Sequence, residues 1–446
     1  MAGDALVFTP KPDRPPPVAT VGPIGWMRRN LFGSVSDALL TLLGAYCAFW
    51  LVAVFLDWGV FNAMWEAENR RACFDAIGTA GACWAGVVEW SKAIIYGLYP
   101  AEELWRINAG FLVLIAWVVP LWLQRVQSKV AIGLSAVLIY PFLASYFFLG
   151  GEKGLLWSAL IALGLFAFVL VLATVATERA RGQTIGRFFL AMAGIDPDDE
   201  ARARRALWLG TGAVYLLCLG AVAMWSLQEV GTRLWGGFFL TVVISGFGIA
   251  FSLPAGVLLA LGRRSDMVVI SSLCTAFIEL FRSVPLITIL FMFNTMLPLF
   301  VPSDVEINQL LRAIVAVCFF SSAYMAETVR GGLQAIPRGQ IEAAQSLGLG
   351  YWRTTGLIVL PQALKIMIPS IVSVFIGLFK DTTLVSIIGL FDILNIARSV
   401  GEDPDWLGMF IEPFFVTALI YFVFCLAMSS YSISLENRLS AGERRS

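Results

Sequence analysis

The hydrophobic positions of this chain gather in long runs that polar segments separate. Each run has about 20 residues, enough for a helix to cross a bilayer core of roughly 30 Å. The pattern predicts ten membrane spans, at residues 35–56, 109–124, 130–149, 154–176, 207–227, 235–261, 268–297, 309–327, 359–380 and 411–434. The predicted fold class is therefore all-α, a polytopic membrane protein with about 10 transmembrane helices.

The basic residues between the hydrophobic runs predict how the spans are oriented across the membrane. If the N-terminus is cytoplasmic, the inside loops hold 20 of the 31 Lys and Arg residues and the outside segments hold 8. Loops on the cytoplasmic side are enriched in Lys and Arg. Both termini, and the loop at 328–358, are therefore predicted to be cytoplasmic.

Composition narrows the possible chemistry. The chain is 59% hydrophobic and 14% charged, where a soluble domain carries roughly 25% charged residues. Its zero net charge gives no sign of a nucleic-acid partner. It contains no His, which removes His-based metal sites, general bases and proton relays. It has no G-x-x-x-x-G-K-[ST] loop, so ATP would have to bind to another subunit. We expect no metal, no cofactor and no enzymatic activity on this chain.

The chain divides into four predicted parts. Residues 1–34 are Pro-rich and polar, and we interpret them as a disordered cytoplasmic arm. Residues 35–230 form an N-terminal membrane region of about five helices with an outside loop at 57–108. Residues 231–434 hold five spans with short links, and 435–446 form a cytoplasmic tail.

The outside loop contains two cysteines, Cys73 and Cys83. On the predicted topology both face the oxidising side of a bacterial membrane, where cysteines tend to pair. We expect a disulfide between them; the alternative is two unpaired small residues.

One polar stretch, "GQIEAAQSLGLGYWRTTGLIVLPQA", lies in the predicted cytoplasmic loop between the eighth and ninth spans. Pro337 can open a helix there, and Gly348 or Gly350 can close it. Ile341, Ala344 and Leu347 recur at three-residue spacing and give this helix a narrow apolar face. A helix this short is marginal alone in water, so it either packs on another protein or rests on the bilayer surface.

The same stretch carries a recognisable motif: Glu342-Ala343-Ala344, Gly348, Ile358 and Leu360-Pro361. It resembles the EAA loop of permease subunits in bacterial ABC importers. The segments "AYMAETVRGGLQAIPRGQIEAAQSLGL", "PQALKIMIPSIVSVFIGLFKDTTLVSIIGL" and "FIELFRSVPLITILF" resemble the polar amino-acid permeases, the histidine, glutamine and arginine importers among them. This resemblance covers about 235–434, the ABC importer permease core.

The first half resembles only the extended members of that family. "GACW", "YPAEELWRIN" and "WGGFFLTVV" look like segments of importers for general L-amino acids or for glutamate, glutamine, aspartate and asparagine. The role of residues 1–230 stays open at this point. This region could shield the transport core, bind the partner permease or contact the binding protein. It could also be a receptor or a purely structural part.

The resemblance implies a permease subunit that moves polar L-amino acids inward across the bacterial inner membrane. Its EAA loop would be the coupling helix that docks on a cytoplasmic ATPase, with Glu342, Ala343, Ala344, Gly348 and Pro361 as its key positions. The implied partners are an ATP-binding subunit carrying ATP and Mg, a second permease or a second copy, an extracytoplasmic binding protein, and lipid. A secondary amino-acid transporter without an ATPase partner is the alternative, although no paired halves are visible. A membrane-embedded enzyme is disfavoured by the missing His.

Ionisable residues near the membrane are candidates for the substrate path. An amino acid needs a cation for its carboxylate and an anion for its ammonium group, and Arg282 offers bidentate geometry. Glu279 and Arg282, one helical turn apart, can also pair with each other. The alternative is a structural ion-pair network, to which Glu327 would belong. The candidates are Glu279, Arg282, Lys380, Asp381 and Thr382, the last of which can instead cap a helix end.

Overall fold

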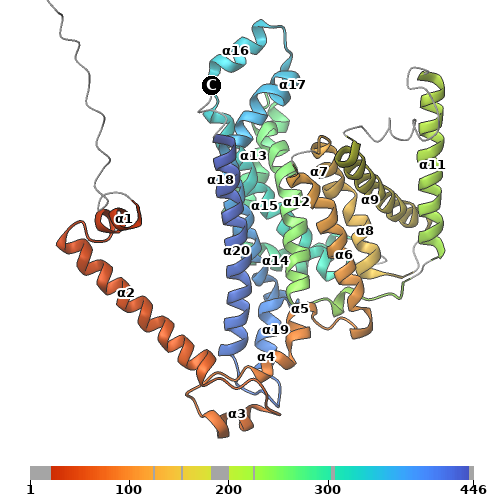
Figure 1. Cartoon of the computed structure of the whole chain (residues 1–446). Helices are drawn as coiled ribbons and strands as arrows, with labels where there is room; N and C mark the ends of the chain where they lie inside the picture. The colour runs from red at the N-terminus through yellow and green to blue at the C-terminus, as the bar shows by residue number, and fades with distance from the viewer. Residues whose placement is uncertain are drawn as a thin grey trace, which may run out of the picture. The chain divides into compact units, whose positions relative to one another are not determined.

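The computed structural model describes residues 22–123, 126–151, 154–181, 200–224, 227–302 and 307–440. Every regular element within these ranges is a helix, and the backbone bridges found there are isolated pairs. The chain forms two compact units, Met1–Val88 (unit 1) and Glu89–Ser446 (unit 2). Figure 1 draws the whole chain as a ribbon.

Unit 1 contains α1 (Gly22–Asn30), α2 (Val35–Leu56), a π-helical turn (Asp57–Phe61) and α3 (Arg70–Ile77). The Ser34 hydroxyl begins α2 by accepting a hydrogen bond from the N–H of Asp37 at 3.1 Å. Helix α1 lies in the arm predicted to be disordered, so that prediction was wrong for these nine residues. Arg28 and Arg29 stand in its last turn, where a cation is favourable to the helix dipole. Residues 1–21 of the predicted arm lie outside the described residues.

The helix α4 (Ala85–Glu89) leads into unit 2. The helices of unit 2 are α5 (Ser91–Tyr96), α6 (Leu104–Val118), α7 (Lys129–Leu138), α8 (Tyr140–Leu149), α9 (Leu155–Arg181), α11 (Glu200–Met224), α12 (Gly237–Arg263), α13 (Val268–Ser283), α14 (Leu286–Met296), α15 (Gln309–Ala335), α16 (Arg338–Ser346), α17 (Tyr351–Thr354), α18 (Leu360–Asp381), α19 (Ile393–Val400) and α20 (Ile411–Ser440).

Among the described residues, eight helices are long and apolar enough to cross a membrane, and two bent pairs bring the total to as many as ten. Each of the ten predicted spans coincides with one of these helices or pairs, so the all-α, multi-pass prediction is confirmed. Helix α20 continues to Ser440, so the predicted tail begins as helix; residues 441–446 lie outside the described part. So do residues 182–199 of the charged inside loop.

The span predicted at 268–297 is not one continuous helix, and here the prediction was wrong. Helices α13 and α14 meet at an angle of 108°. Pro285 explains the break, because the residue before a proline is driven out of the α conformation. Val284 is accordingly extended, with φ −110° and ψ 134°. The pair α7 and α8 bends by 42° at Tyr140-Pro141 for a related reason, since proline lacks the N–H that a continuous helix needs.

The centre of the C-terminal bundle is the contact of α12 with α15, where glycines allow close packing. A Cβ on Gly256 would lie 2.6 Å from the side chain of Met325, and a Cβ on Gly248 would lie 3.0 Å from that of Val317, both on α15. A hydrophobic cluster that includes Ala260, Ile278 and Val329 ties α12, α13, α15 and α18 together.

Residues 89–230 share one core with this bundle. The ring of Phe239 on α12 meets the rings of Tyr99, Phe111 and Phe148, with centroids 6.1, 6.0 and 5.0 Å away. Backbones also touch at the start of α12, where a Cβ on Gly97 would lie 2.3 Å from Gly236. The sequence predicted a boundary at residue 230, whereas the structure divides after Val88.

A fully buried cation closes this junction. The Arg106 guanidinium, on α6, donates from Nε to the carbonyl of Phe147 and from Nη1 to that of Gln228, both at 2.8 Å. Glu103 lies 3.5 Å away and balances its charge. Arg106 therefore joins α6 to the end of α8 and to the link before α12.

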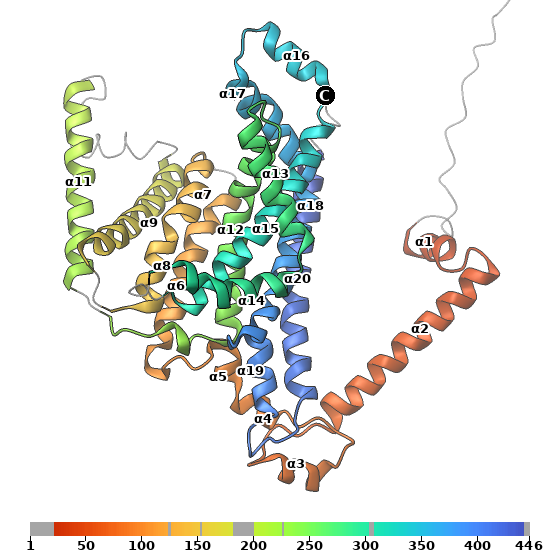
Figure 2. The ribbon, with the colours of Figure 1, turned by 180° about the vertical axis from the view of Figure 1, so that it is seen from behind.

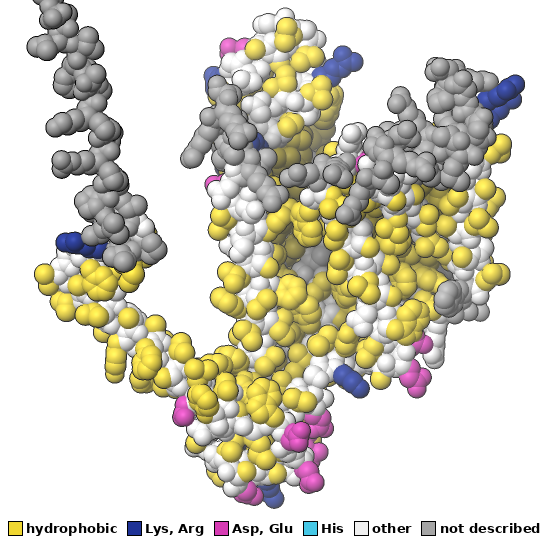
Figure 3. Space-filling view, in the orientation of Figure 1, with side chains coloured by type: hydrophobic (Ala, Val, Ile, Leu, Met, Phe, Trp, Pro, Cys, Tyr) yellow, Lys and Arg dark blue, Asp and Glu magenta, His cyan; other side chains and the backbone are white. Residues whose placement is uncertain are grey.

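The loops of unit 2 gather at two opposite ends. Figures 1 and 2 place α16 and α17 at one end, with the C-terminal part of α20, and α5 and α19 at the other. Between these ends, hydrophobic side chains cover the helices on the face that Figure 3 shows. This arrangement agrees with the alternation of loops predicted from the sequence.

Candidate functional site

The polar helix expected after Pro337 is α16, and it lies at the end of the bundle. One face is anchored: Ala344 is buried and Ile341 packs against the cluster formed by α12, α13, α15 and α18. Glu342 and Ala343 are exposed on the other side. The carboxylate of Glu342 forms no ion pair within the described part of the chain.

Gly348 ends α16 with a Schellman motif. Its N–H donates to the carbonyl of Gln345 at 2.9 Å, and the N–H of Leu349 donates to that of Ala344 at 3.1 Å. This geometry needs a left-handed residue, and Gly348 has φ +75°. No atom lies within 4 Å of the position a Cβ would take, so the backbone rather than space demands glycine here.

Large apolar side chains are exposed on both sides of this cap. Leu347 is 80% exposed, so its predicted place on the apolar face of the helix was wrong, because the chain turns away from the bundle at Gly348. Trp352 is 74% exposed and Tyr351 is 58% exposed. Exposed apolar side chains that gather in one place mark a surface that contacts another protein or the membrane.

Pro361 follows a distortion in the helix that leads back to the membrane. A π-helical turn at Thr355–Val359 separates α17 from α18, and Pro361 is the second residue of α18. A proline inside a helix cannot donate to the carbonyl four residues earlier and clashes with it, and a π-turn relieves that conflict.

A cavity of about 390 Å³ lies between α15 and α18. Small-molecule sites have volumes of roughly 300–1,000 Å³. Its polar groups come from Ser321, Tyr324, Ser373 and Asp381, and its apolar lining includes Phe320. Of the five candidates for the substrate path, Asp381 is the one that lines this cavity.

The remaining candidates lie in different surroundings. Lys380 is exposed, and Thr382 is fully buried, donating to the carbonyl of Phe379 at 2.7 Å. Glu279 and Arg282 do not appear as an ion pair with each other. Glu279 contacts Arg263 of α12 at 2.9 Å, whereas Arg282 lies 3.4 Å from Glu327 of α15.

Sequence reasoning missed Arg263, Arg330 and Tyr324 as neighbours of these charges. Arg330 donates to Glu327 at 3.0 Å, and the Arg282 guanidinium stands 5.8 Å above the ring of Tyr324. In the sequence, Arg263 and Arg330 stand in predicted inside loops. The spacing Tyr324, Glu327, Arg330 is a signal for Tyr324 and Arg330, since residues three apart share a helix face, whereas Arg263 on α12 leaves no such local signal.

Asp392, at the start of α19, was also missed. Its carboxylate is fully buried and accepts hydrogen bonds from the N–H groups of Asn395 at 3.0 Å and Leu394 at 3.3 Å. Burial raises the pKa of Asp392 to about 7, and the hydrogen bonds from the backbone only partly oppose this. Asp392 therefore caps the helix partly in its neutral form near pH 7.

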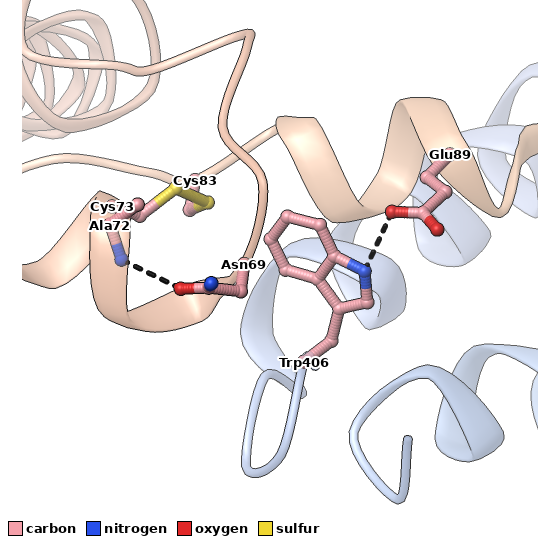
Figure 4. Close-up of a disulfide and its surroundings, with 6 residues drawn as sticks. All are labelled: Asn69, Ala72, Cys73, Cys83, Glu89 and Trp406. Carbon is pink, nitrogen blue, oxygen red and sulfur yellow. Dashed lines mark hydrogen bonds between the residues drawn. A yellow bond between two sulfur atoms is a disulfide. The ribbon is translucent and has the colours of Figure 1, made fainter. Parts of the chain in front are cut away.

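Cys73 and Cys83 are joined by a disulfide in unit 1, with Cα atoms 6.0 Å apart (Figure 4). Asn69 begins α3 beside it by accepting a hydrogen bond from the N–H of Ala72 at 3.0 Å. In unit 2, the buried Trp406 donates from its indole nitrogen to Glu89 at 2.9 Å, which ties the loop after α19 to the end of α4. No group of His, Cys, Asp or Glu side chains in the described ranges could hold a metal ion.

Comparison with known proteins places this geometry in a family. A family model described as "Binding-protein-dependent transport system inner membrane component" matches residues 252–440. The inner membrane amino-acid ABC transporter permease protein YhdY of Escherichia coli K12 is 38% identical over 436 residues, which cover 98% of each chain. The chain belongs to the amino-acid ABC transporter permeases.

Two further proteins resemble this permease. The glutamate/glutamine/aspartate/asparagine transport system permease protein BztC of Rhodobacter capsulatus is 39% identical over 439 residues, 97% of each chain. A solved structure described as an amino acid ABC transporter with histidines is 30% identical, with a TM-score of 0.41; the match covers 45% of this chain and 92% of that one. The predicted resemblance is confirmed. The chain is a multi-pass transport subunit of the inner membrane, and the alternative of a secondary transporter is not supported.

Proposed function

We propose that this permease moves polar L-amino acids inward and is driven by a separate ATP-binding subunit that docks on α16. The observation that carries the proposal is the full-length similarity to two amino-acid ABC transporter permeases. One of them is named for glutamate, glutamine, aspartate and asparagine, which supports polar amino acids as the cargo.

The geometry of α16 supports its role as the coupling helix. Its inner face is fixed to the bundle by Ala344 and its end is fixed by the cap at Gly348, so a force on α16 reaches α15 and α18. Glu342 and Ala343 are left free for a partner. ATP binding to that partner can shift the permease between two states only if the partner binds one state more tightly.

The assembly we propose contains further partners. ATP and Mg belong to the ATP-binding subunit, because this chain has no phosphate-binding loop. A second permease subunit or a second copy completes the pore, and an extracytoplasmic binding protein delivers the amino acid. The excess of Lys and Arg in the loops at the α16 end supports a cytoplasmic position for this end and for both termini.

The cavity between α15 and α18 is the proposed place for the substrate. The carboxylate of Asp381 would meet the α-ammonium group. Arg282 does not line the cavity, but it stands over the ring of Tyr324, which does, and would meet a carboxylate from that side. Lys380 and Thr382, at the end of α18, would hold Asp381 in position rather than contact the amino acid directly.

The test is co-purification of the tagged permease from its native host in mild detergent, followed by an ATPase assay. Gly348→Asp strains the left-handed cap, and Gly339→Asp is the matched control because its surroundings are equally open and its backbone is ordinary. An ATP-binding subunit that co-purifies with the wild type and Gly339→Asp, and is lost or uncoupled in Gly348→Asp, supports the proposal. Absence of an ATPase from the intact wild-type complex would sink it.

A further inference from the structure

Five charged side chains from three helices meet beside the cavity. Glu327 on α15 is the centre: Arg282 of α13 lies 3.4 Å away, Arg263 of α12 lies 3.6 Å away, and Arg330 donates to it at 3.0 Å. Glu279 of α13 contacts Arg263 at 2.9 Å. The cluster consists of Arg263, Glu279, Arg282, Glu327 and Arg330.

The charges in this cluster do not balance. Three guanidinium groups face two carboxylates, which leaves one excess positive charge. The buried Nε of Arg282 has no hydrogen-bond partner in the part of the chain that the structure describes, and the buried Nη1 of Arg263 has only its 3.6 Å ion pair with Glu327. A purely structural network would be expected to satisfy such donors, because a buried N–H without a partner is costly.

The cluster also lies in a definite place along the bundle. Arg282 stands over the ring of Tyr324, which lines the cavity with Asp381. From Tyr324, the residues Glu327 and Arg330 follow at one-turn steps along α15 toward Ala335, which precedes α16. The excess positive charge therefore lies between the cavity and the α16 end. The side chain of Glu279 is 51% exposed there, whereas those of Arg263, Arg282 and Glu327 are 27%, 32% and 23% exposed, so the cluster is accessible at the Glu279 edge.

We infer that this cluster is an anion-selective passage, through which substrates with a second carboxylate leave the cavity faster than their neutral amides. The inference rests on the proposed function and names the preferred class as dicarboxylic amino acids. A passage lined with excess positive charge raises the local concentration of anions. Clefts lined by one sign of charge raise association rates by roughly 10- to 1,000-fold, and a single excess charge in physiological salt should act at or below the low end of this range.

The experiment measures uptake by the whole transporter in proteoliposomes that contain ATP, with the same loaded binding protein throughout. The readout is the ratio of L-glutamate to L-glutamine transported per delivered molecule. Arg282→Gln removes the excess charge, Glu279→Gln adds one more positive charge, and Arg282→Lys keeps the charge as the matched control. A ratio for the same binding protein cancels losses that affect both substrates equally.

We expect the glutamate-to-glutamine ratio to fall threefold to tenfold in Arg282→Gln, to rise by a similar factor in Glu279→Gln, and to stay near the wild-type value in Arg282→Lys. An unchanged ratio in Glu279→Gln and Arg282→Gln, with both substrates slowed alike, would overturn the inference and leave the proposed function intact. If Arg282→Gln does not assemble, Glu279→Gln alone decides, because its effect has the opposite sign. A wild-type transporter that takes up neither amino acid would overturn both.

Discussion

Replacing Gly348 with alanine tests whether the cap of the proposed coupling helix α16 is needed for coupling, because it changes only the preference of one residue for a positive φ. Gly348 has φ +75°, and its N–H and that of Leu349 hold the last turn of α16. An alanine Cβ meets no atom within 4 Å, so the substitution adds no clash. The change acts only on the preference of the backbone for the left-handed conformation.

The size of the effect follows from that preference. A non-glycine residue in the left-handed region loses about 1–2 kcal/mol. A loss of this size lowers the ratio of capped to frayed helix by a factor of about 5–30. Asparagine tolerates this conformation better than alanine, and a β-branched residue tolerates it worse. We therefore expect coupling to decrease in the order glycine, asparagine, alanine, valine at position 348.

The assay is stimulation of ATPase activity by the loaded binding protein in the complete complex, with thermal melting of the same samples. Stimulation should fall several-fold in Gly348→Ala while the melting temperature stays near that of the wild type, because α16 lies at the end of the bundle. Gly339→Ala is the control, since its surroundings are equally open. Full stimulation in both Gly348→Ala and Gly348→Val would refute the reasoning.

Three further outcomes are expected. Burial raises the pKa of Asp392 from 3.8 to about 7, so the folded state binds more protons than the unfolded state between these two pH values. The free energy of unfolding should therefore fall by up to about 4 kcal/mol as the pH rises through this window, and then level off. Asp392→Asn keeps the cap and should remove the slope, which melting curves from pH 5 to 8 would show. Loss of the disulfide in Cys73→Ala should destabilise unit 1 by at most about 3 kcal/mol and raise hydrogen exchange around α3, and prompt alkylation of both Cys73 and Cys83 in the unreduced wild type would contradict this. Arg106→Met leaves two buried carbonyls unpaired and should lower stability by about 2–4 kcal/mol, whereas Arg106→Lys should lose less; equal melting of the two variants would argue against the hydrogen bonds.

Much of the fold could be predicted because the bilayer imposes one length on every span. The ten apolar runs all became helices or bent pairs, including the run at 268–297. Its break at Pro285 was predictable in principle from the proline, but hydropathy over a window cannot register a local change in φ and ψ. The shared core of residues 89–230 with α12 could not be predicted, because contacts such as Phe148 with Phe239 join distant parts of the sequence.

For the candidate site, the sequence predicts the ends of α16 but not the partners of the ionisable residues. The ends of α16 follow from Pro337 and Gly348, whose effects are local. The ionisable residues were identified individually, but their partners were not. Arg282 has a neighbour of opposite charge one turn away and still contacts Glu327 on another helix, because the rotation of α13 in the bundle decides which face it presents.

The aromatic contact around Phe239 has a consequence for how a pore could be assembled. Tyr99, Phe111 and Phe148 occupy the flank of α12 that would otherwise be open to a neighbouring chain. The second permease subunit that we propose would therefore have to approach from a flank that α6 and α8 leave uncovered. The additional helices would then restrict the number of ways in which two such chains can be joined.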